Sequence, residues 1–383
     1  MRIVYITEYF PYHGEGDITG GAESRCFNIA KNLSEKHETI IITSWKKGQE
    51  RKHNIGNIKI YRVGQNHEYS NEGNITSRLK FSRAAYKTAR KIKADITEGY
   101  NFISYLPAYH ASKKTKSKSI ATYHEVWIGE WIKNKGFITG ILGEIWERAA
   151  LSKNWDQIIS VSNFTAKRIK KRTKIIPNGI DIESYNEKET KFQEPTICSI
   201  SRLTPKKRVQ DLIKATAIVK KEIPNIKTII IGKGDEINSL KQLTKQLNLE
   251  NNVKFTGFVK EHKDVIKTLK KSHIFCLPSI LEGFGIVLLE AMASKVPYVC
   301  SDIEVLKEVT QNGKGGFIFK NQEPKDLANK LLFLLKNKDL YKQKVDEGTK
   351  LVKDYDWKII SQNIEKEYQD LINNKELPRL ELK

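Results

Sequence analysis

The sequence predicts an α/β protein of two domains, each built on a doubly wound parallel sheet. Short apolar runs alternate with helical patterns along the chain, as they do when helices cover both faces of a parallel sheet. A chain of 383 residues exceeds one ordinary core, and a polar stretch divides the apolar runs into two series. Each series also contains a glycine-bearing turn where such a sheet binds ligands, at the carboxyl ends of strands.

The apolar runs give the order of the expected elements. Strands are expected at residues 2–7, 39–43, 58–63, 119–123 and 157–161 in the first series, and at residues 196–201, 227–231, 253–255, 273–277 and 297–300 in the second. Between them, Pro177-Asn178-Gly179-Ile180-Asp181 leads into a charged stretch at 183–194, which is the best linker in the chain. The last segment carries apolar residues at helical spacing and predicts a closing helix: Trp357, Ile360, Ile364, Tyr368 and Leu371.

The composition and the lengths of the apolar runs predict the cellular compartment and the general class of the protein. Hydrophobic residues make up 39% of the chain, which is enough for a real interior. No apolar run reaches the roughly 18 to 20 residues that span a bilayer, and the first residues have a strand pattern instead of that of a signal peptide. The four cysteines stand singly without metal-ligand spacing. We therefore expect a cytoplasmic protein with reduced, buried cysteines.

The net charge of +22 has two interpretations. Residues 79–93 predict an amphipathic helix with an apolar face of Phe81, Ala85, Thr88 and Ile92, opposite Lys80, Arg83, Lys87, Arg90 and Lys91. Further cations cluster at residues 113–118 and 167–174. These faces are either simply solvated or attracted to anionic phospholipid. Nucleic acid fits less well, because no aromatic side chains are interleaved with the charges.

Residues 282–290 are the most informative part of the chain. Glu282 and Glu290 flank a Gly-Phe-Gly turn that opens into an apolar helix. Glycines let the backbone approach a ligand, and the free amides and positive dipole of a helix start attract phosphate. The two carboxylates would repel a phosphate that they touched, so we expect them to accept hydrogen bonds from hydroxyls beside it. Hydroxyls on both sides of a diphosphate describe a nucleotide sugar.

Three other turns follow predicted strands or precede predicted helices. Arg202 and Lys207 lie in a basic loop after the strand at 196–201, where they either converge on a diphosphate or are merely solvated. Gly20 and Gly21 precede a helix expected at 24–33, although such a pair is also common in simple turns. The sequence Gly232-Lys233-Gly234 lacks the third glycine of a dinucleotide site. No Asp-x-Asp follows a strand end, so we expect no metal cofactor.

Together these motifs resemble the retaining glycosyltransferases of family 4 (glycosyl transferases group 1), over nearly the whole chain. The resemblance implies the GT-B fold, in which two Rossmann-like domains face each other across a cleft. It places an acceptor domain at 1–182, a donor domain at 183–355 and a closing helix at 356–383 that packs back on the first domain. It also implies transfer of a hexose-type sugar, without a metal, from a UDP-, GDP- or ADP-linked donor to a saccharide or lipid-linked acceptor.

The resemblance also implies a role for each motif. Glu290 would bind the ribose, and Arg202 and Lys207 would neutralise the leaving phosphate. Glu282 would engage the transferred sugar together with the amides of Gly283, Phe284 and Gly285. The diphosphate would meet the amides of Ile286 and Val287, and Gly20 and Gly21 from the other domain.

The resemblance implies two further site residues for which the local sequence pattern gives less support. Gly257 belongs to the segment that resembles the family's base-contacting residues, and His124 follows the strand at 119–123 as the family's active-site histidine does. A lone histidine at a strand end is more often structural. Many relatives carry a Gly-Gly pair where this chain has Ser301-Asp302-Ile303-Glu304, and this difference would alter how that loop meets donor or acceptor.

Three functions from different classes follow. The first is a glycosyltransferase of cell-envelope glycans that works in the cytoplasm, with an added expectation of peripheral contact at an anionic membrane. The second is a sugar-nucleotide epimerase of the same fold, which needs an acid and a base to move a sugar proton. The third is a nucleic-acid binding protein, which only the charge suggests.

Overall fold

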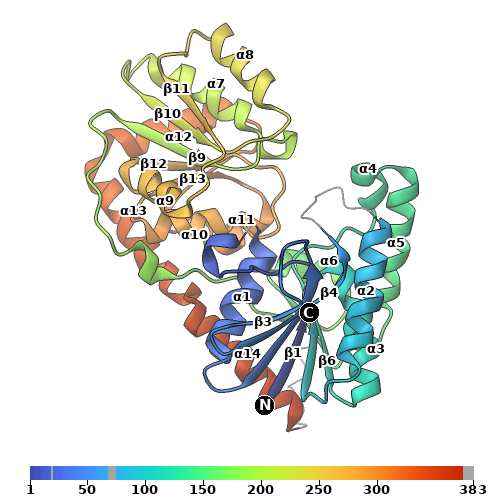
Figure 1. Cartoon of the computed structure of the whole chain (residues 1–383). Coiled ribbons are helices and arrows are strands. Elements are labelled where there is room, and N and C mark those ends of the chain that lie inside the picture. The colour runs from blue at the N-terminus through green and yellow to red at the C-terminus, as the bar shows by residue number, and fades with distance from the viewer. Residues whose placement is uncertain (19, 68–74, 374–383) are drawn as a thin grey trace. The chain divides into compact units, whose positions relative to one another are not determined.

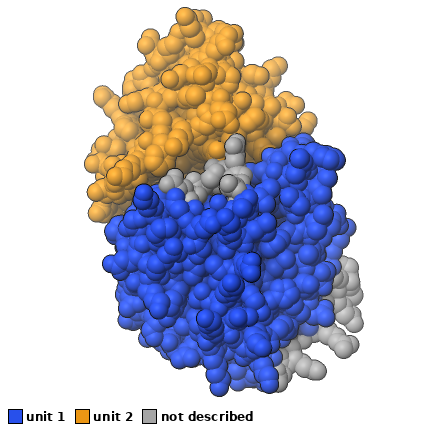
Figure 2. Space-filling view, turned by 45° about the vertical axis from the view of Figure 1, so that its right-hand side comes forward, with its two compact units in different colours: residues 1–178, 357–383 blue, residues 179–356 orange. Residues whose placement is uncertain are grey.

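The structure is a computed structural model that describes residues 1–18, 20–67 and 75–373. The chain divides into two compact units (Figure 2). Unit 1 contains Met1–Asn178 together with the segment that begins at Trp357, and unit 2 contains Gly179–Asp356. Across the described ranges, no helix is both long and apolar enough to cross a membrane.

Unit 1 is built on a sheet that has eight strands within its described residues. Their order is β3 (Lys52–Ile55), β4 (Ile58–Asn66), β2 (Glu38–Trp45), β1 (Arg2–Ile6), β5 (Ile96–Gly99), β6 (Lys118–Tyr123), β7 (Gln157–Ser160) and β8 (Lys174–Ile175). Only the β3–β4 pair is antiparallel among these neighbours. The chain moves outward from β1 in both directions, so the sheet has its topological switch point between β1 and β5.

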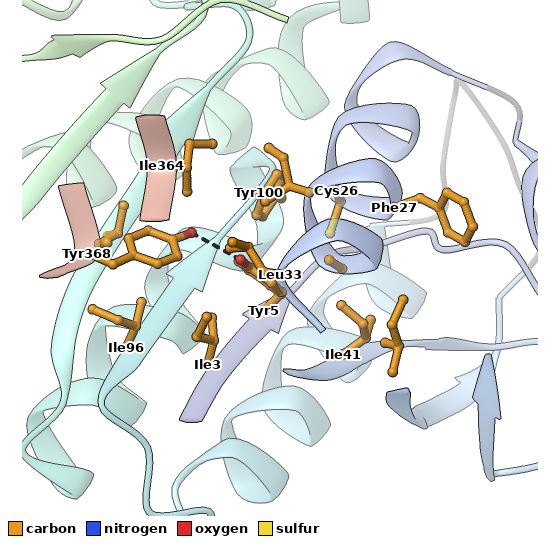
Figure 3. Close-up of a cluster of buried hydrophobic side chains, with 14 of the residues drawn as sticks. Ile3, Tyr5, Cys26, Phe27, Leu33, Ile41, Ile96, Tyr100, Ile364 and Tyr368 are labelled. Atoms are coloured by element: carbon orange, nitrogen blue, oxygen red, sulfur yellow. Dashed lines mark hydrogen bonds between the residues drawn. The ribbon is translucent and has the colours of Figure 1, made fainter. Parts of the chain in front are cut away.

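Helices cover both faces of this sheet because side chains alternate along β1. Ile3 and Tyr5 pack with α1 (Gly21–Leu33) and α14 (Trp357–Ile372). Figure 3 shows Tyr368 of α14 directed at Tyr5, to which its hydroxyl donates at 3.2 Å. Val4 and Ile6 face the other layer, which contains α2 (Ile75–Ala89) and α3 (Phe102–Thr115). The closing helix therefore belongs to the core of unit 1.

Unit 2 has a six-stranded parallel sheet within residues 179–356, all of which are described. Its order is β11 (Val253–Gly257), β10 (Lys227–Ile231), β9 (Thr196–Ile200), β12 (Ile274–Leu277), β13 (Tyr298–Ser301) and β14 (Gly316–Phe319). One face packs on α7 (Val209–Lys220) and α12 (Pro324–Lys336). The order reverses between β9 and β12, which is the switch point of this sheet.

Most of the remaining helices lie between consecutive strands, and α13 follows the last strand (Figure 1). Unit 1 contains α4 (Trp131–Lys135), α5 (Phe137–Leu151) and α6 (Asn163–Ile169). Unit 2 contains α8 (Ile237–Gln246), α9 (His262–Lys271), α10 (Ile286–Ala293), α11 (Glu304–Val309) and α13 (Lys338–Leu351). Short 3-10 helices lie at Glu15–Asp17, Ile182–Tyr185, Pro205–Lys207 and Val352–Tyr355.

The strands expected from the sequence are all present, with ends that differ by a few residues. The pattern missed β3, β5, β8 and β14. Of these, β5 matters most, because it forms one side of the switch point in unit 1. It is only four residues long and includes Glu98, whose side chain is fully buried, so its composition does not look like that of an interior strand. The four cysteines are unpaired and buried, as predicted.

Candidate active site

The two loops that leave the switch point of unit 2 are joined to each other. One follows β9 and carries Arg202 and Lys207, and the other follows β12 and carries Glu282. The amide of Ile280 donates to the carbonyl of Lys206 at 2.9 Å, so the backbones of the two loops are in direct contact. In an open α/β sheet the carboxyl ends of strands at the switch point form the usual ligand site.

Lys207 and Glu282 form an ion pair at this point. Lys207 Nζ lies 2.6 Å from Glu282 Oε1, and the two side chains are 23% and 10% exposed. The structure therefore brings together a cation and a carboxylate that are 75 positions apart in the chain. Arg202 is exposed, and within the described residues no ion pair is recorded for its guanidinium. It remains available to an anionic ligand at the same loop.

The Gly-x-Gly turn after β10 fixes the position of the Arg202 loop. A Cβ on Gly232 would lie 1.9 Å from the carbonyl oxygen of Ser201, and one on Gly234 would lie 2.1 Å from that of Leu203. The amide of Leu203 donates to the carbonyl of Lys233 at 3.0 Å. Only glycine permits this approach of two backbones. The sequence signal was a Gly-x-Gly directly after a strand, and its use here is to support a neighbouring loop.

The Gly-Phe-Gly turn sets the start of α10. Gly285 is the residue before the helix and has φ +87°, and a Cβ there would lie 2.6 Å from Leu306 Cδ2. Phe284 is buried, with its ring edge-on to Tyr355 at 6.2 Å. Gly283 precedes this anchor and is partly exposed.

α10 begins directly after this turn. Ile286 and Val287 are its first two residues, and amides in a first turn have no partner within the helix. They lie at the positive end of the helix dipole, directly after the loop that carries Glu282. This arrangement suits an anionic ligand that touches backbone groups.

Glu290 is held by two residues that the sequence did not single out. Its carboxylate Oε1 lies 3.2 Å from His262 Nε2 at the start of α9, and it also hydrogen-bonds Tyr185. The carboxylate hydrogen bond raises the pKa of His262, against the opposing effect of burial. Glu290 itself is 12% exposed. Its carboxylate is thus oriented from two sides, one by the segment that opens unit 2 and one by α9.

Gly257 ends β11 on the outer side of β10. Its φ of +72° favours glycine, although a Cβ there would meet open space. The amide of Gly232 donates to its carbonyl at 2.9 Å, which connects it to the turn that supports the Arg202 loop. The next residue, Phe258, is 65% exposed and lies under Lys233, whose Nζ is 4.9 Å from the ring centroid.

In unit 1, the glycine pair lies at the start of α1. Gly20 is the residue before the helix and Gly21 is its first residue, so the helix begins earlier than the sequence predicts. Gly21 is exposed, and a Cβ there would meet no atom within 4 Å. Gly20 and Gly21 belong to unit 1, whereas Lys207, Glu282 and Glu290 belong to unit 2.

His124 follows β6, as predicted, and its imidazole is neutral. Burial, and then the charge of Arg25, lower its pKa from 6.5 to about 3. Its Nε2 is buried and has no hydrogen-bond partner in the described structure. Buried nitrogens in purely structural histidines are normally satisfied, so this one is suited to a ligand hydroxyl. A neutral ring can exchange a hydrogen bond with that hydroxyl but cannot act as an acid near pH 7.

The sequence did not predict two buried charged side chains in unit 1, Arg25 and Glu98. Arg25 is fully buried, and its Nη1 donates to the carbonyl of Pro177 at 2.5 Å and to Asn178 Oδ1 at 3.2 Å. Glu98 is also fully buried and accepts from Thr122 Oγ1 at 2.6 Å, and burial raises its pKa. Arg25 thereby ties α1 to the last residues of the first stretch of unit 1.

Two family models match consecutive parts of the chain. Residues 19–184 match Glycosyltransferase Family 4, and residues 181–351 match Glycosyl transferases group 1. The chain belongs to the family 4 glycosyltransferases. Its architecture of two doubly wound units is the GT-B fold that the sequence predicts. Among the described residues of this family 4 member, no three His, Cys, Asp or Glu side chains gather in a group able to hold a metal ion.

Individual relatives agree with this assignment. Phosphatidyl-myo-inositol mannosyltransferase of Mycobacterium leprae is 30% identical over 201 residues, which are 51% of this chain and 52% of that protein. An uncharacterized glycosyltransferase of Methanocaldococcus jannaschii is 24% identical over 97% of this chain and 99% of its own length. The matches to the first curated relatives thus span only about half of those proteins.

Solved structures share the fold at low sequence identity. Sucrose-phosphate synthase from Thermosynechococcus elongatus has a TM-score of 0.81 at 18% identity, covering 98% of this chain and all of that one. HepE from Anabaena, in complex with UDP-glucose, has a TM-score of 0.72 at 19% identity, covering 97% of this chain and all of that one.

Proposed function

We propose that this family 4 member transfers a hexose-type sugar from a nucleoside-diphosphate sugar to a saccharide or lipid-linked acceptor, with retention of configuration. The observation that carries the proposal is the partly buried Lys207–Glu282 pair at the switch point of unit 2, on the loop that leads to the first-turn amides of α10. A cation, a helix start and a carboxylate at one sheet edge suit a diphosphate linked to a group rich in hydroxyls.

Each group has a distinct role in this proposal. Lys207 and Arg202 neutralise the diphosphate, and the amides of Ile286 and Val287 bind it. We place charge neutralisation on these groups and not on a metal cofactor. Glu290 accepts hydrogen bonds from the ribose.

The sugar and the base have their own partners. Glu282, together with the backbone of residues 283–285, binds hydroxyls of the transferred sugar. In this proposal the backbone at Gly257, which ends β11, reads the base. His124 is a neutral hydrogen-bond partner for a sugar hydroxyl, in line with its lowered pKa.

The reaction is a displacement at the anomeric carbon. The bond between that carbon and the diphosphate oxygen breaks, and a bond to the acceptor oxygen forms on the same face. The acceptor hydroxyl gives its proton to an oxygen of the departing diphosphate, so no side-chain nucleophile is needed. Oriented cations and amides stabilise the negative charge that develops on the leaving group, and this electrostatic stabilisation supplies most of the rate enhancement.

The names of similar proteins support the donor and acceptor classes. HepE is described in complex with UDP-glucose, and the mycobacterial relative is named for mannosyl transfer to a phosphatidylinositol. We place the reaction in the cytoplasm and in cell-envelope glycan synthesis. The relatives are named as transferases, so neither the epimerase nor the nucleic-acid hypothesis is favoured.

Donor binding and donor turnover test the proposal separately. A thermal-shift panel of UDP-, GDP- and ADP-sugars should show stabilisation by one base, because a ligand that binds only the folded state raises its stability. Mass spectrometry should then show release of the nucleoside diphosphate that depends on an added acceptor. Conversion of the donor into an isomeric sugar nucleotide without acceptor would contradict the proposal, as would binding of none of the donors.

A further inference from the structure

The most exposed large apolar side chains of the described structure gather on α4 and α5 of unit 1. Phe137 is 71% exposed and Ile138 is 75% exposed, more than any other large apolar residue described. We name the apolar ridge from these two residues and three neighbours: Ile132 at 48%, Leu142 at 48% and Ile145 at 59%. Single exposed apolar residues are normal on a surface, but a contiguous group indicates contact with another body.

The ridge is exposed because the opposite side of α5 is used for packing. Ile138, Leu142 and Ile145 follow each other at helical spacing and form one stripe. On the other side, a Cβ on Gly140 would lie 2.5 Å from Ile132 Cα, and one on Gly143 would lie 2.4 Å from the ring of Trp131. The absence of side chains at these glycines lets α4 lie directly on α5.

A buried hydrogen bond fixes the same pair of helices. Trp131 Nε1 donates to Glu147 Oε2 at 2.6 Å, and Glu147 is nearly fully buried. The amide of Gly129 donates to Glu144 Oε2 at 2.8 Å. These contacts hold α4 and α5 as one rigid hairpin, so the outward direction of the ridge follows from tight packing beneath it.

A basic hollow borders the ridge. Figure 1 shows α2, α3 and α5 side by side, and residues of these helices line an open surface hollow of about 740 Å³. Its walls include Leu79, Arg83, Tyr86, Lys113, Lys114 and Trp146, and no carboxylate of a described residue lines it. Trp146 follows Ile145 in α5, so the hollow and the ridge share this helix.

The structure changes the interpretation of α2. The sequence suggested that α2 could offer both an apolar and a basic face to a membrane. Phe81, Ala85 and Ala89 instead pack in the core of unit 1. The outer side of α2 carries exposed cations and Leu79, which is 45% exposed, whereas the two most exposed large apolar side chains lie on α5.

We propose that the apolar ridge and the basic hollow together dock unit 1 on an anionic phospholipid bilayer. The ridge would enter the boundary between headgroups and acyl chains, and the cations of the hollow would meet lipid phosphates. A second copy of the chain fits less well, because a symmetric contact through this face would bring Arg83, Lys113 and Lys114 against their own counterparts. The inference concerns a surface of unit 1 and does not depend on the donor chemistry of unit 2.

Vesicle flotation tests the proposal directly. The full chain should float with phosphatidylcholine vesicles that contain about 25% phosphatidylglycerol, and more weakly with pure phosphatidylcholine. The double variant Ile138→Ser/Leu142→Ser should lower binding to the anionic vesicles by about tenfold or more, because two exposed apolar side chains can no longer enter the bilayer. The variant Arg83→Glu/Lys114→Glu should lose binding to a similar degree and abolish the preference for anionic lipid.

Matched controls separate docking from general surface effects. Phe333 is 52% exposed on α12 of unit 2, and Lys241 is exposed on α8. Phe333→Ser and Lys241→Glu should bind vesicles as the unaltered chain does. All variants should keep the circular dichroism spectrum and the donor-induced thermal shift of the unaltered chain, which shows that failure to dock is not failure to fold.

Three results would overturn the proposal. The first is an unaltered chain that floats with neither vesicle. The second is flotation of Ile138→Ser/Leu142→Ser that equals that of the unaltered chain. Membrane binding would then depend on charge alone and not on the apolar ridge. The third is an unaltered chain that binds no vesicles and forms a dimer in sedimentation equilibrium, if Ile138→Ser/Leu142→Ser dissociates that dimer. The ridge would then be covered by a second copy of the chain.

Discussion

Removing one charge at a time from the Lys207–Glu282 pair should change UDP affinity in opposite directions. Lys207→Met keeps the stem of the side chain and removes its charge, and Glu282→Gln keeps the shape of the carboxylate and removes its charge. With the atoms 2.6 Å apart and the side chains 23% and 10% exposed, each charge largely screens the other in the free protein. A diphosphate would benefit from the lysine and be repelled by the glutamate.

The expected magnitude follows from partly buried charges. A unit charge about 6 Å from a phosphate contributes about 3 kcal/mol at an effective dielectric constant of about 20. Exposure and salt reduce this, so Lys207→Met should weaken UDP binding by about tenfold to a hundredfold. Glu282→Gln frees the lysine and should tighten UDP binding by about fivefold, or about 1 kcal/mol. Both variants should nevertheless lose sugar transfer.

Isothermal titration calorimetry with UDP alone, repeated at raised salt, measures these changes. The exposed pair Lys336–Glu222 offers a control, because Lys336→Met and Glu222→Gln remove the same charges elsewhere in unit 2. If Glu282→Gln weakened UDP binding as much as Lys207→Met, the carboxylate would be needed for the phosphate site itself. The assignment of Glu282 to the sugar would then be refuted.

Three further predictions concern the support of the Arg202 loop, the ribose site and His124. Gly234→Ala should weaken UDP binding by about tenfold or more, since the new Cβ would force Leu203 and the Arg202 loop to move. UDP affinity should fall by up to about fivefold as pH rises through the raised pKa of His262, because the ring then loses the proton that pairs it with the carboxylate of Glu290. His262→Gln should remove this pH dependence. As pH falls from 7.5 to 5, the free energy of unfolding of unit 1 should fall by about 2 kcal/mol, because His124 takes up a proton in the unfolded chain but not in the folded one. His124→Gln should flatten this dependence of unfolding free energy on pH.

Each of these has a measurement and a contrary result. Gly313 has φ +96° and ordinary contacts for a Cβ, so Gly313→Ala reports backbone strain alone, and equal UDP affinities of the two alanine variants would refute the loop argument. For His262, calorimetric profiles of the unaltered chain and the variant that run parallel across pH would contradict its role. For His124, hydrogen exchange in unit 1 measures the slope, and an unaltered slope in the glutamine variant would exclude this residue as its source.

The sequence predicts the parts of the site that are contiguous in the chain. Glu282, the Gly-Phe-Gly turn and Glu290 lie within nine positions, so the helix start and its two carboxylates could be inferred from spacing alone. Arg202 and Lys207 could be placed because a loop after a parallel strand lies at the ligand edge of a sheet. Their direct ionic contact with the second loop depends on the order of β9 and β12, which spacing does not reveal.

Other contributors carry no local signal. His262 and Tyr185 reach Glu290 only after the chain has folded, because one begins α9 and the other closes a short 3-10 helix. Glu98 was missed together with β5, because a buried carboxylate in a four-residue strand contradicts the apolar pattern of an interior strand. Long-range hydrogen bonds stabilise such a residue, and a single sequence does not display them.

The most direct test of the central claim is a crystal structure of the protein with UDP. The account predicts the diphosphate against Lys207 and the first amides of α10, with the ribose hydroxyls on the carboxylate of Glu290. Density for the nucleotide away from the switch point of unit 2, with Glu290 still bonded only to His262 and Tyr185, would contradict it.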